Sequence, residues 1–411
     1  MKNRPNILLI TCDQLQAAAT GCYGNPDVQT PHIDALADSG IRFSHGISNA
    51  PVCMSARSVL LSGQYNRTCT GGMANVTYPA GKAGSYPMPE YPAPGRLHFP
   101  DATLPELLQA AGYQTAVIGK WHIYTWPDVI GFDHYVIPRT HHVHSAQHYV
   151  EDGKTEFVPA GWSIDFETER AIRYIKQWDG EKPFFLHLNY SPPHPPLNDC
   201  PEKYLNMYDP ASMTLRENVD ESKPFPSEHD FRVYRWDYRY YELQLPYTMK
   251  SMDYSIRNIY ADYYGNVTWM DENLGKVLKS LEDSGKRQDT MVVFTADHGD
   301  NLGSHGRCGK GLPYDESLQV PMIYSLPGGS ARLEQESIAG HVDVAPALLT
   351  LSGIEVPEHM AGTDVLNDKV EAGISEITPG NLAARTDRFT AHADLRDGSR
   401  RLAFFDNHSD P

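Results

Sequence analysis

Short apolar runs alternate along the chain with longer stretches in which apolar residues recur at helical spacing. The first run, residues 7–11, reads as a strand, and residues 31–39 follow as an amphipathic helix that begins at a proline. The rhythm then repeats. A helix followed by a strand is predicted at 104–111 and 115–119, at 165–178 and 184–189, and at 256–281 and 291–295. This alternation predicts an α/β fold with a mostly parallel central sheet and helices on both faces.

Two segments interrupt the rhythm. Residues 71–100 are rich in glycine, proline and tyrosine, and residues 213–250 are crowded with charged and aromatic side chains. Both are predicted to be insertions that lie over the sheet. A chain of 411 residues with no low-complexity tract is expected to bury one large core. We therefore predict a main α/β domain over residues 1–366 and a small C-terminal subdomain or tail over 367–411.

The charge of the chain limits the partners that it can bind. The formal net charge is −17, and binding to nucleic acid is driven by basic surface that neutralises phosphates. Nucleic acid is therefore excluded as a partner, and an anionic substrate would need a local positive pocket. No segment approaches the roughly twenty apolar residues of a membrane span, so a membrane is excluded as well.

The N-terminal residues and the cysteines indicate the cellular compartment in which the protein is expected. The apolar residues 7–10 form too short a run for a secretory signal peptide, and no cleavage site follows them. The 6 cysteines show no metal-type spacing and fit reduced thiols better than a disulfide framework. We expect a cytoplasmic protein, with the alternative that a signal peptide has been removed.

Cys53 stands four residues before Arg57 in the segment CMSAR, ahead of an apolar run. A lone cysteine in such a place is usually a small buried apolar residue. The segment also resembles the nucleophile motif of the sulfatases, with Ser55 where that family usually has proline. In sulfatases this cysteine is oxidised after synthesis to formylglycine, whose hydrated aldehyde attacks the sulfate ester. The resemblance thus implies a catalytic Cys53 and Arg57, and a formylglycine-generating maturation enzyme as a partner.

Further motifs follow predicted strands. Asp13 comes just after the first strand, and Asp297 and His298 come just after the strand 291–295, so a parallel sheet delivers them to one edge. Hard oxygen ligands there suit a divalent cation. The resemblance implies that Asp13, Asp297 and His298 bind this metal, with formylglycine at position 53 completing the ligand set. Many sulfatases have an acidic residue where this chain has Gln14. Ca²⁺ is the first expectation, with Mn²⁺ and Mg²⁺ as alternatives.

Four more residues lie in segments that are similar to sulfatase motifs. Lys120 and His122 belong to the segment GKWH, His194 to PHPP, and Lys310 ends GSHGRCGK. The resemblance implies that Lys120 and Lys310 contact the sulfate, that His122 acts on the formylglycine hydroxyl, and that His194 donates a proton to the leaving oxygen or binds the sulfate. The matching motifs occur in the family's order between residue 6 and about residue 325.

These motifs describe one chemistry. Charge builds on the oxygens of a sulfate ester as its sulfur is attacked, and the metal with Arg57, Lys120 and Lys310 would supply positive charge there. In the mechanism that the resemblance implies, Asp297 would accept a proton from the attacking hydroxyl. His122 would then remove the proton of the second hydroxyl, so that sulfate leaves and the aldehyde returns.

The expected function is that of a sulfuric-ester hydrolase that cleaves a carbohydrate or aryl sulfate monoester. A phosphonate monoester hydrolase or phosphodiesterase of the same superfamily is the alternative, since these enzymes often have the Asp-Gln pair found here at Asp13 and Gln14. A non-catalytic binding protein with the same fold is a third reading, motivated by Ser55. The presence of Lys120, His122, His194 and Lys310 argues against it.

Two clusters leave alternatives open. Arg232, Arg235 and Arg239 lie among five aromatic residues in an otherwise acidic chain, and we expect them to form a lid that binds a second anionic group and a sugar or aryl ring. A structural loop or a contact in a homo-oligomer is the alternative. The histidines at 141, 142, 144 and 148 resemble a second metal site, but a polar surface loop is the preferred interpretation.

Overall fold

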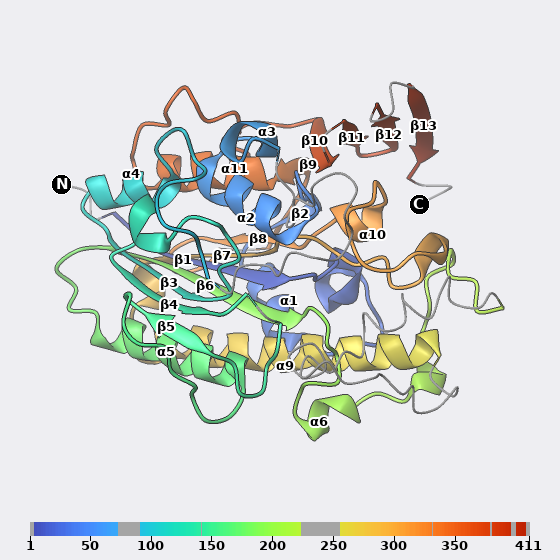
Figure 1. The fold of residues 1–411 in the computed structure, drawn as a ribbon, viewed down its shortest axis with the longest axis horizontal. Helices are drawn as coiled ribbons and strands as arrows, with labels where there is room; N and C mark the ends of the chain where they lie inside the picture. Colours follow the sequence, from blue (N-terminus) through green and yellow to red (C-terminus); the bar gives the residue numbers. More distant parts are fainter. Residues whose placement is uncertain are drawn as a thin grey trace.

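The structure is a computed structural model that describes residues 4–72, 91–140, 142–222, 255–330, 332–378, 380–395 and 400–407. A large sheet crosses the centre of the molecule, and helices cover both of its faces (Figure 1). The predicted α/β fold is thereby confirmed.

The large sheet has nine strands in the order β5-β4-β3-β6-β1-β7-β8-β2-β9. Its strands are β1 (Asn6–Asp13), β2 (Ile41–Ile47), β3 (Gln114–Gly119), β4 (His134–Pro138), β5 (Tyr149–Glu151), β6 (Phe184–Pro193), β7 (Thr290–Ala296), β8 (Met322–Ser325) and β9 (Leu333–Gly340). The pairs β4-β5, β7-β8 and β2-β8 are antiparallel and the others are parallel. The carboxyl ends of β3, β6, β1 and β7 therefore meet at one edge.

The alternation of side chains along β1 explains the two layers of helices. Leu8 and Ile10 belong to the core that contains α1, α5, α6 and α9, whereas Ile7 and Leu9 belong to the core that contains α2, α3, α4 and α11. The helices are α1 (Pro31–Asp38), α2 (Cys53–Ser62), α3 (Asn66–Cys69), α4 (Leu104–Ala110), α5 (Ser163–Gln177), α6 (Glu202–Leu205), α9 (Ile256–Asp283), α10 (Asp315–Leu318) and α11 (His341–Leu351). Every residue of β1 is buried, as a central strand covered on both faces requires.

The described part of the C-terminal tail forms a second, antiparallel sheet at the end of the large sheet near β9 (Figure 1). Its strands are β10 (Ala372–Thr378), β11 (Asn381–Thr386), β12 (Phe389–Asp394) and β13 (Arg401–Asp406). Arg385 donates two hydrogen bonds of 2.8 Å to the carboxylate of Asp315 and so ties this sheet to α10. The division at residue 366 stays a prediction.

The two predicted insertions are only partly described. Tyr91, in the first, stacks on Trp126 with 6.0 Å between ring centroids, and residues 73–90 lie outside the described part of the chain. In the second, residues 223–254 lie outside it, and with them Arg232, Arg235 and Arg239. Among the helices that the structure describes, none combines the length and the apolar character that crossing a membrane requires.

Candidate active site

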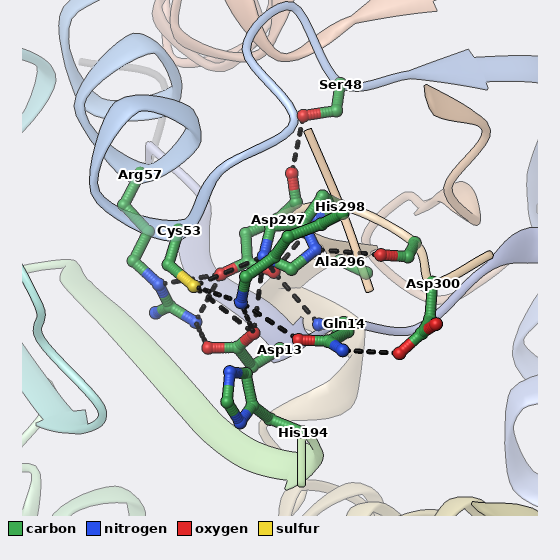
Figure 2. A network of polar contacts seen from close by, with 12 residues as sticks. Asp13, Gln14, Ser48, Cys53, Arg57, His194, Ala296, Asp297, His298 and Asp300 are labelled. Carbon is green, nitrogen blue, oxygen red and sulfur yellow. Dashed lines mark hydrogen bonds and ion pairs between the residues drawn. The ribbon is translucent and has the colours of Figure 1, made fainter. Parts of the chain in front are cut away.

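The predicted site residues come together at the carboxyl edge of the large sheet, although they are spread along most of the chain. Figure 2 shows the Cys53 thiol pointing toward Asp13, Asp297 and His298. Asp13 ends β1, and Asp297 and His298 directly follow β7, the neighbour of β1. The other members are Arg57 on α2, Lys120 and His122 after β3, His194 after β6, and Lys310 in the loop that follows β7.

Cys53 is the first residue of α2, so its side chain lies at the positive end of the helix dipole. The residue is fully buried, and its Sγ is 2.9 Å from Lys310 Nζ, 3.2 Å from His298 Nε2 and 3.6 Å from Asp13 Oδ1. Here Sγ is that of the unmodified thiol, and it stands in for the oxygens that a hydrated formylglycine would carry. Position 53 thus faces a cation on one side and candidate metal ligands on the other.

Arg57 lies one turn further along α2, and its buried guanidinium group contacts residues at the carboxyl edge of the large sheet. Its Nε and Nη2 are each 3.0 Å from Asp297 Oδ2, and its Nη1 donates to Asn189 Oδ1 at 2.8 Å and to the Lys120 carbonyl at 3.0 Å. These partners fix the guanidinium plane beside position 53. Asn189 is a site residue that the sequence did not predict, although its place at the end of a predicted strand is a usable signal.

Asp13, Cys53, Asp297 and His298 form the candidate metal centre, since each has a ligand atom within 4.8 Å of the others. His298 Nδ1 donates to the Gly299 carbonyl at 2.9 Å, which leaves the Nε2 lone pair directed inward. That Nε2 is 3.5 Å from Asp13 Oδ1 and 3.5 Å from Asp297 Oδ1. Acceptors that converge on one point fit a divalent cation.

The charges around Asp297 keep it ionised. Burial raises the pKa of its carboxyl, but His298, Arg57, Lys120 and Lys310 outweigh burial and lower the pKa below its ordinary value. The carboxylate also accepts the His298 main-chain N–H at 2.9 Å. Asp297 is therefore an anion that is held in place from several sides.

Gly119 permits the turn that brings Lys120 into the site. Its φ is +94°, and a Cβ at this position would lie 2.0 Å from the Asn189 carbonyl oxygen, so only glycine fits. The Lys120 ammonium forms an ion pair with Asp13 and lies 3.9 Å from Cys53 Sγ. Burial and the facing charge of Lys310 lower the pKa of Lys120 well below its ordinary range.

Three imidazoles line the site beside Lys120. His142 Nδ1 accepts a hydrogen bond from Lys120 Nζ at 3.0 Å, and its ring stacks on His194 with 3.7 Å between centroids. The His122 ring lies 5.7 Å from that of His142, and neither of its nitrogens has a hydrogen-bond partner in the described structure. Burial, followed by the neighbouring charges, lowers the pKa of all three well below the ordinary value, so they are neutral.

The interpretation of residues 141–148 as a polar surface loop is wrong for two of its histidines. His142 belongs to the site, and His144 is fully buried, with its Nδ1 3.1 Å from Ser163 Oγ. Asp199 accepts the His144 main-chain N–H at 2.6 Å and so folds this loop back over the sheet edge. His148 pairs with Glu156 at 2.8 Å, and residue 141 lies outside the described structure.

Glu167 is a buried acid behind the site, on the face of α5 that packs on the sheet. It is 1% exposed, and its Oε1 accepts a hydrogen bond from the Tyr149 hydroxyl at 2.8 Å. Its Oε2 has no hydrogen-bond partner among the described residues. Desolvation raises the pKa of this carboxyl to about 8, despite the opposing effects of Tyr149, Arg57 and Lys120.

We expect Glu167→Gln to make the protein more resistant to unfolding at alkaline pH. A carboxyl whose folded pKa is raised stabilises the fold below its unfolded pKa, and this contribution is lost as pH rises toward about 8. The loss is about 1.4 kcal/mol per pH unit in that window, and glutamine does not titrate. Thermal unfolding at pH 5 and pH 9 measures the effect. An equal pH dependence in wild type and variant would show that Glu167 is ionised in the folded protein.

Comparison with known proteins gives concordant matches. A family model described as Sulfatase matches residues 5–354. An ulvan-active sulfatase of Formosa agariphila is 30% identical to this chain, over 99% of the chain and 76% of that protein.

Solved structures resemble the chain along its whole length. One, bound to its substrate D-glucosamine-2-N,6-O-disulfate, superposes with a TM-score of 0.81 at 25% identity, covering 100% of this chain and 92% of that chain. A phosphonate monoester hydrolase of Agrobacterium radiobacter has a TM-score of 0.70 at 21% identity, covering 99% and 90%. The second likeness shows the fold alone.

Proposed function

The chain belongs to the sulfatase family and is a sulfuric-ester hydrolase, and we propose that it cleaves a sulfate monoester of a saccharide. The observation that carries the proposal is a group of three cationic side chains around position 53. Lys120 and Lys310 approach Cys53 Sγ, and Arg57 binds Asp297 beside it. The saccharide follows from two relatives, one active on ulvan and one bound to a disulfated glucosamine.

Cationic side chains supply the binding energy for the sulfate group. Lys120 and Lys310 lie 3.9 Å and 2.9 Å from Cys53 Sγ, within reach of an anion that reacts at this atom's position. Arg57 is fixed by Asp297 and Asn189 and needs no rearrangement as charge develops on the sulfate oxygens. Preorganised charge of this kind stabilises a transition state more than it stabilises the bound substrate.

The proton transfers fall to Asp297, His122 and His194. Asp297 is ionised and lies beside position 53, so it accepts a proton from the attacking hydroxyl. His122 is neutral with both ring nitrogens unpaired in the described structure, which suits a base. His194 donates its Nδ1–H to the Pro195 carbonyl at 2.6 Å, and Nε2 takes up a proton when an anionic sulfate binds and passes it to the leaving oxygen.

Two groups complete the proposed enzyme. Asp13, Asp297 and His298 would hold a divalent cation together with position 53, and we assign Ca²⁺ because two of the three side chains are carboxylates, with Mn²⁺ and Mg²⁺ as alternatives. When bound, the cation supplies positive charge beside the reacting oxygens, and formylglycine made from Cys53 by a maturation enzyme supplies the oxygen nucleophile.

The alternative activity is that of a phosphonate monoester hydrolase or phosphodiesterase. This alternative is supported by the adjacent residues Asp13 and Gln14 in the sequence. The fold is also similar to that of a phosphonate monoester hydrolase, at 21% identity. Assays of the purified protein with glucosamine 6-sulfate, an aryl sulfate, an aryl phosphonate monoester and a phosphodiester decide between the two. We expect the highest kcat/KM for a sulfate ester. A higher kcat/KM for the phosphonate or the diester would overturn the proposal.

We further propose that Arg232, Arg235 and Arg239 bind a second anionic group of the saccharide. Replacing each singly by alanine is expected to raise KM for a disulfated sugar by about 10- to 100-fold, since a charge-assisted hydrogen bond contributes about 1.5–3 kcal/mol. A small aryl sulfate has no such group, so its KM should not change. Arg332→Ala, at an exposed arginine paired with Asp38, is the matched control. Variants that treat both substrates like wild type would leave a structural loop or a subunit contact as the role of this segment.

A further inference from the structure

We propose that Asp300 is a positioning residue, which sets the direction of the Gln14 amide and thereby holds Lys310 against position 53. Asp300, Gln14 and Cys53 are labelled in Figure 2, where the Gln14 side chain lies between the other two. The inference rests on the proposed role of Lys310 in sulfate binding.

Asp300 joins the Gln14 side chain to the loop that carries Lys310. It is fully buried, and its Oδ1 accepts the main-chain N–H groups of Leu302 at 2.9 Å and Gly309 at 3.0 Å. Its Oδ2 accepts a hydrogen bond from Gln14 Nε2. One carboxylate therefore binds both ends of the loop and the side chain of Gln14.

Gln14 has a fixed backbone, so its side chain approaches Asp300 from one direction. Its φ is +65°, its N–H donates to Asp297 Oδ1 at 3.0 Å, and its carbonyl accepts from the Tyr263 hydroxyl at 2.6 Å. Both carboxylate oxygens of Asp300 accept hydrogen bonds, so the amide turns its NH₂ group toward Asp300. The amide oxygen is then left on the opposite side.

That oxygen is where Lys310 binds. Lys310 Nζ donates to Gln14 Oε1 at 2.9 Å and to Cys53 Sγ at 2.9 Å. If the amide were reversed, its NH₂ group would face the ammonium and the lysine would lose an acceptor. The position of Lys310 at Cys53 thus depends on the polarity that Asp300 imposes on Gln14.

The loop itself adds to this dependence. Asn301 and Gly309 are joined by a main-chain hydrogen bond of 2.8 Å, and Gly303 and Arg307 by another of 2.8 Å. Leu302 has a φ of +42°, which is unfavourable for a residue with a side chain. The Asp300 carboxylate accepts the N–H of this strained residue and that of Gly309, next to Lys310.

A charge exchange tests the proposal. Asp300→Asn presents an NH₂ group to that of Gln14, and Gln14→Glu places two carboxylates together. Each single variant is expected to lower kcat/KM for the sulfate ester by about 10- to 100-fold. In the double variant Gln14→Glu/Asp300→Asn, the carboxylate accepts from both the asparagine and Lys310, and the total charge is that of wild type. Its kcat/KM is expected to exceed the product of the two single effects by at least about tenfold.

Asp271→Asn is the matched control. Asp271 is a fully buried aspartate of α9 that accepts the main-chain N–H groups of His32 at 3.1 Å and Ile33 at 2.8 Å. Like Asp300, it binds two main-chain N–H groups, but it does not bind Gln14 in the described structure. When Asp271→Asn is combined with Gln14→Glu, the fold reductions in kcat/KM of the two single variants are expected to multiply. The same result for the Asp300→Asn pair would overturn the proposal.

Two further comparisons keep the outcome decisive. If Asp300→Asn does not fold, the double variant is compared with Gln14→Glu alone, and a double variant no more active than that single variant overturns the proposal. The unfolding temperatures of all variants are measured in parallel. A wild-type protein that cleaves no sulfate ester would overturn the proposed function, and the coupling of Gln14 with Asp300 would then be decided by the unfolding temperatures.

Discussion

Replacing Cys53 by alanine is expected to lower kcat for the sulfate ester by at least about 10⁴-fold, as removal of a catalytic nucleophile does. The residue begins α2, where alanine is well tolerated, and its side chain lies among Lys310, His298 and Asp13 instead of in an apolar core layer. The fold should therefore persist. Steady-state assays and thermal unfolding of the same preparation measure the two effects.

Cys200→Ala provides the control for this variant. Cys200 is also buried, but it lies in the helical layer beneath the sheet and donates to the Leu197 carbonyl. We expect it to retain wild-type kcat. Mass spectrometry of the wild-type peptide that contains position 53 distinguishes cysteine from formylglycine, and activity should scale with the fraction of formylglycine. Full turnover by Cys53→Ala would contradict the assignment of the nucleophile.

Removing the divalent cation, or the carboxylate of Asp297, is expected to cost at least about 10³-fold in kcat, because both supply charge to the reacting group. Asp297→Asn keeps an oxygen for the main-chain N–H groups of Gln14 and His298 but removes the charge that Arg57 faces. Chelation should abolish the activity of the wild type, and added Ca²⁺ should restore it. Parallel titrations with Mn²⁺ and Mg²⁺ rank the candidate ions.

Asp343→Asn is the corresponding control. Asp343 is a buried aspartate that accepts main-chain N–H groups of Gly340 at 2.7 Å and Thr363 at 2.8 Å, at the start of α11. This change should leave the response to chelator as in wild type. If Asp297→Asn keeps both its activity and its sensitivity to chelation, the cation does not bind at this carboxylate.

The sequence was most informative where a side chain ends or directly follows a strand of the central sheet. Asp13, Lys120, His194 and Asp297 all have that position, and parallel strands bring their carboxyl ends to one edge whatever the rest of the chain does. The resemblance to sulfatases then selected among the polar residues there. The position at the end of a strand and the sulfatase motifs are both features of short segments. They can therefore be recognised without knowing which distant strands pair.

The features that the sequence did not predict depend on distant contacts. His142 lies in an irregular loop, and only the fold of that loop brings its ring onto His194 and Lys120. Asn189 gains its role from Arg57, a residue on another element. The strands β2, β8 and β9 extend the sheet beyond β7, but their pairing joins segments nearly 300 residues apart, and no local pattern specifies such a register.

The burial of α2 has a consequence for the period in which the chain is being synthesised. All ten residues of this helix are buried, and the partner of Cys53 at His298 lies 245 positions later in the chain. At about 5–20 residues per second, a ribosome needs about 12–50 s to synthesise that interval. The contacts that His298 and α11 make with α2 cannot form until β7 and α11 have emerged. We therefore expect the oxidation that we propose for Cys53 to take place during synthesis, before the folded protein buries this residue.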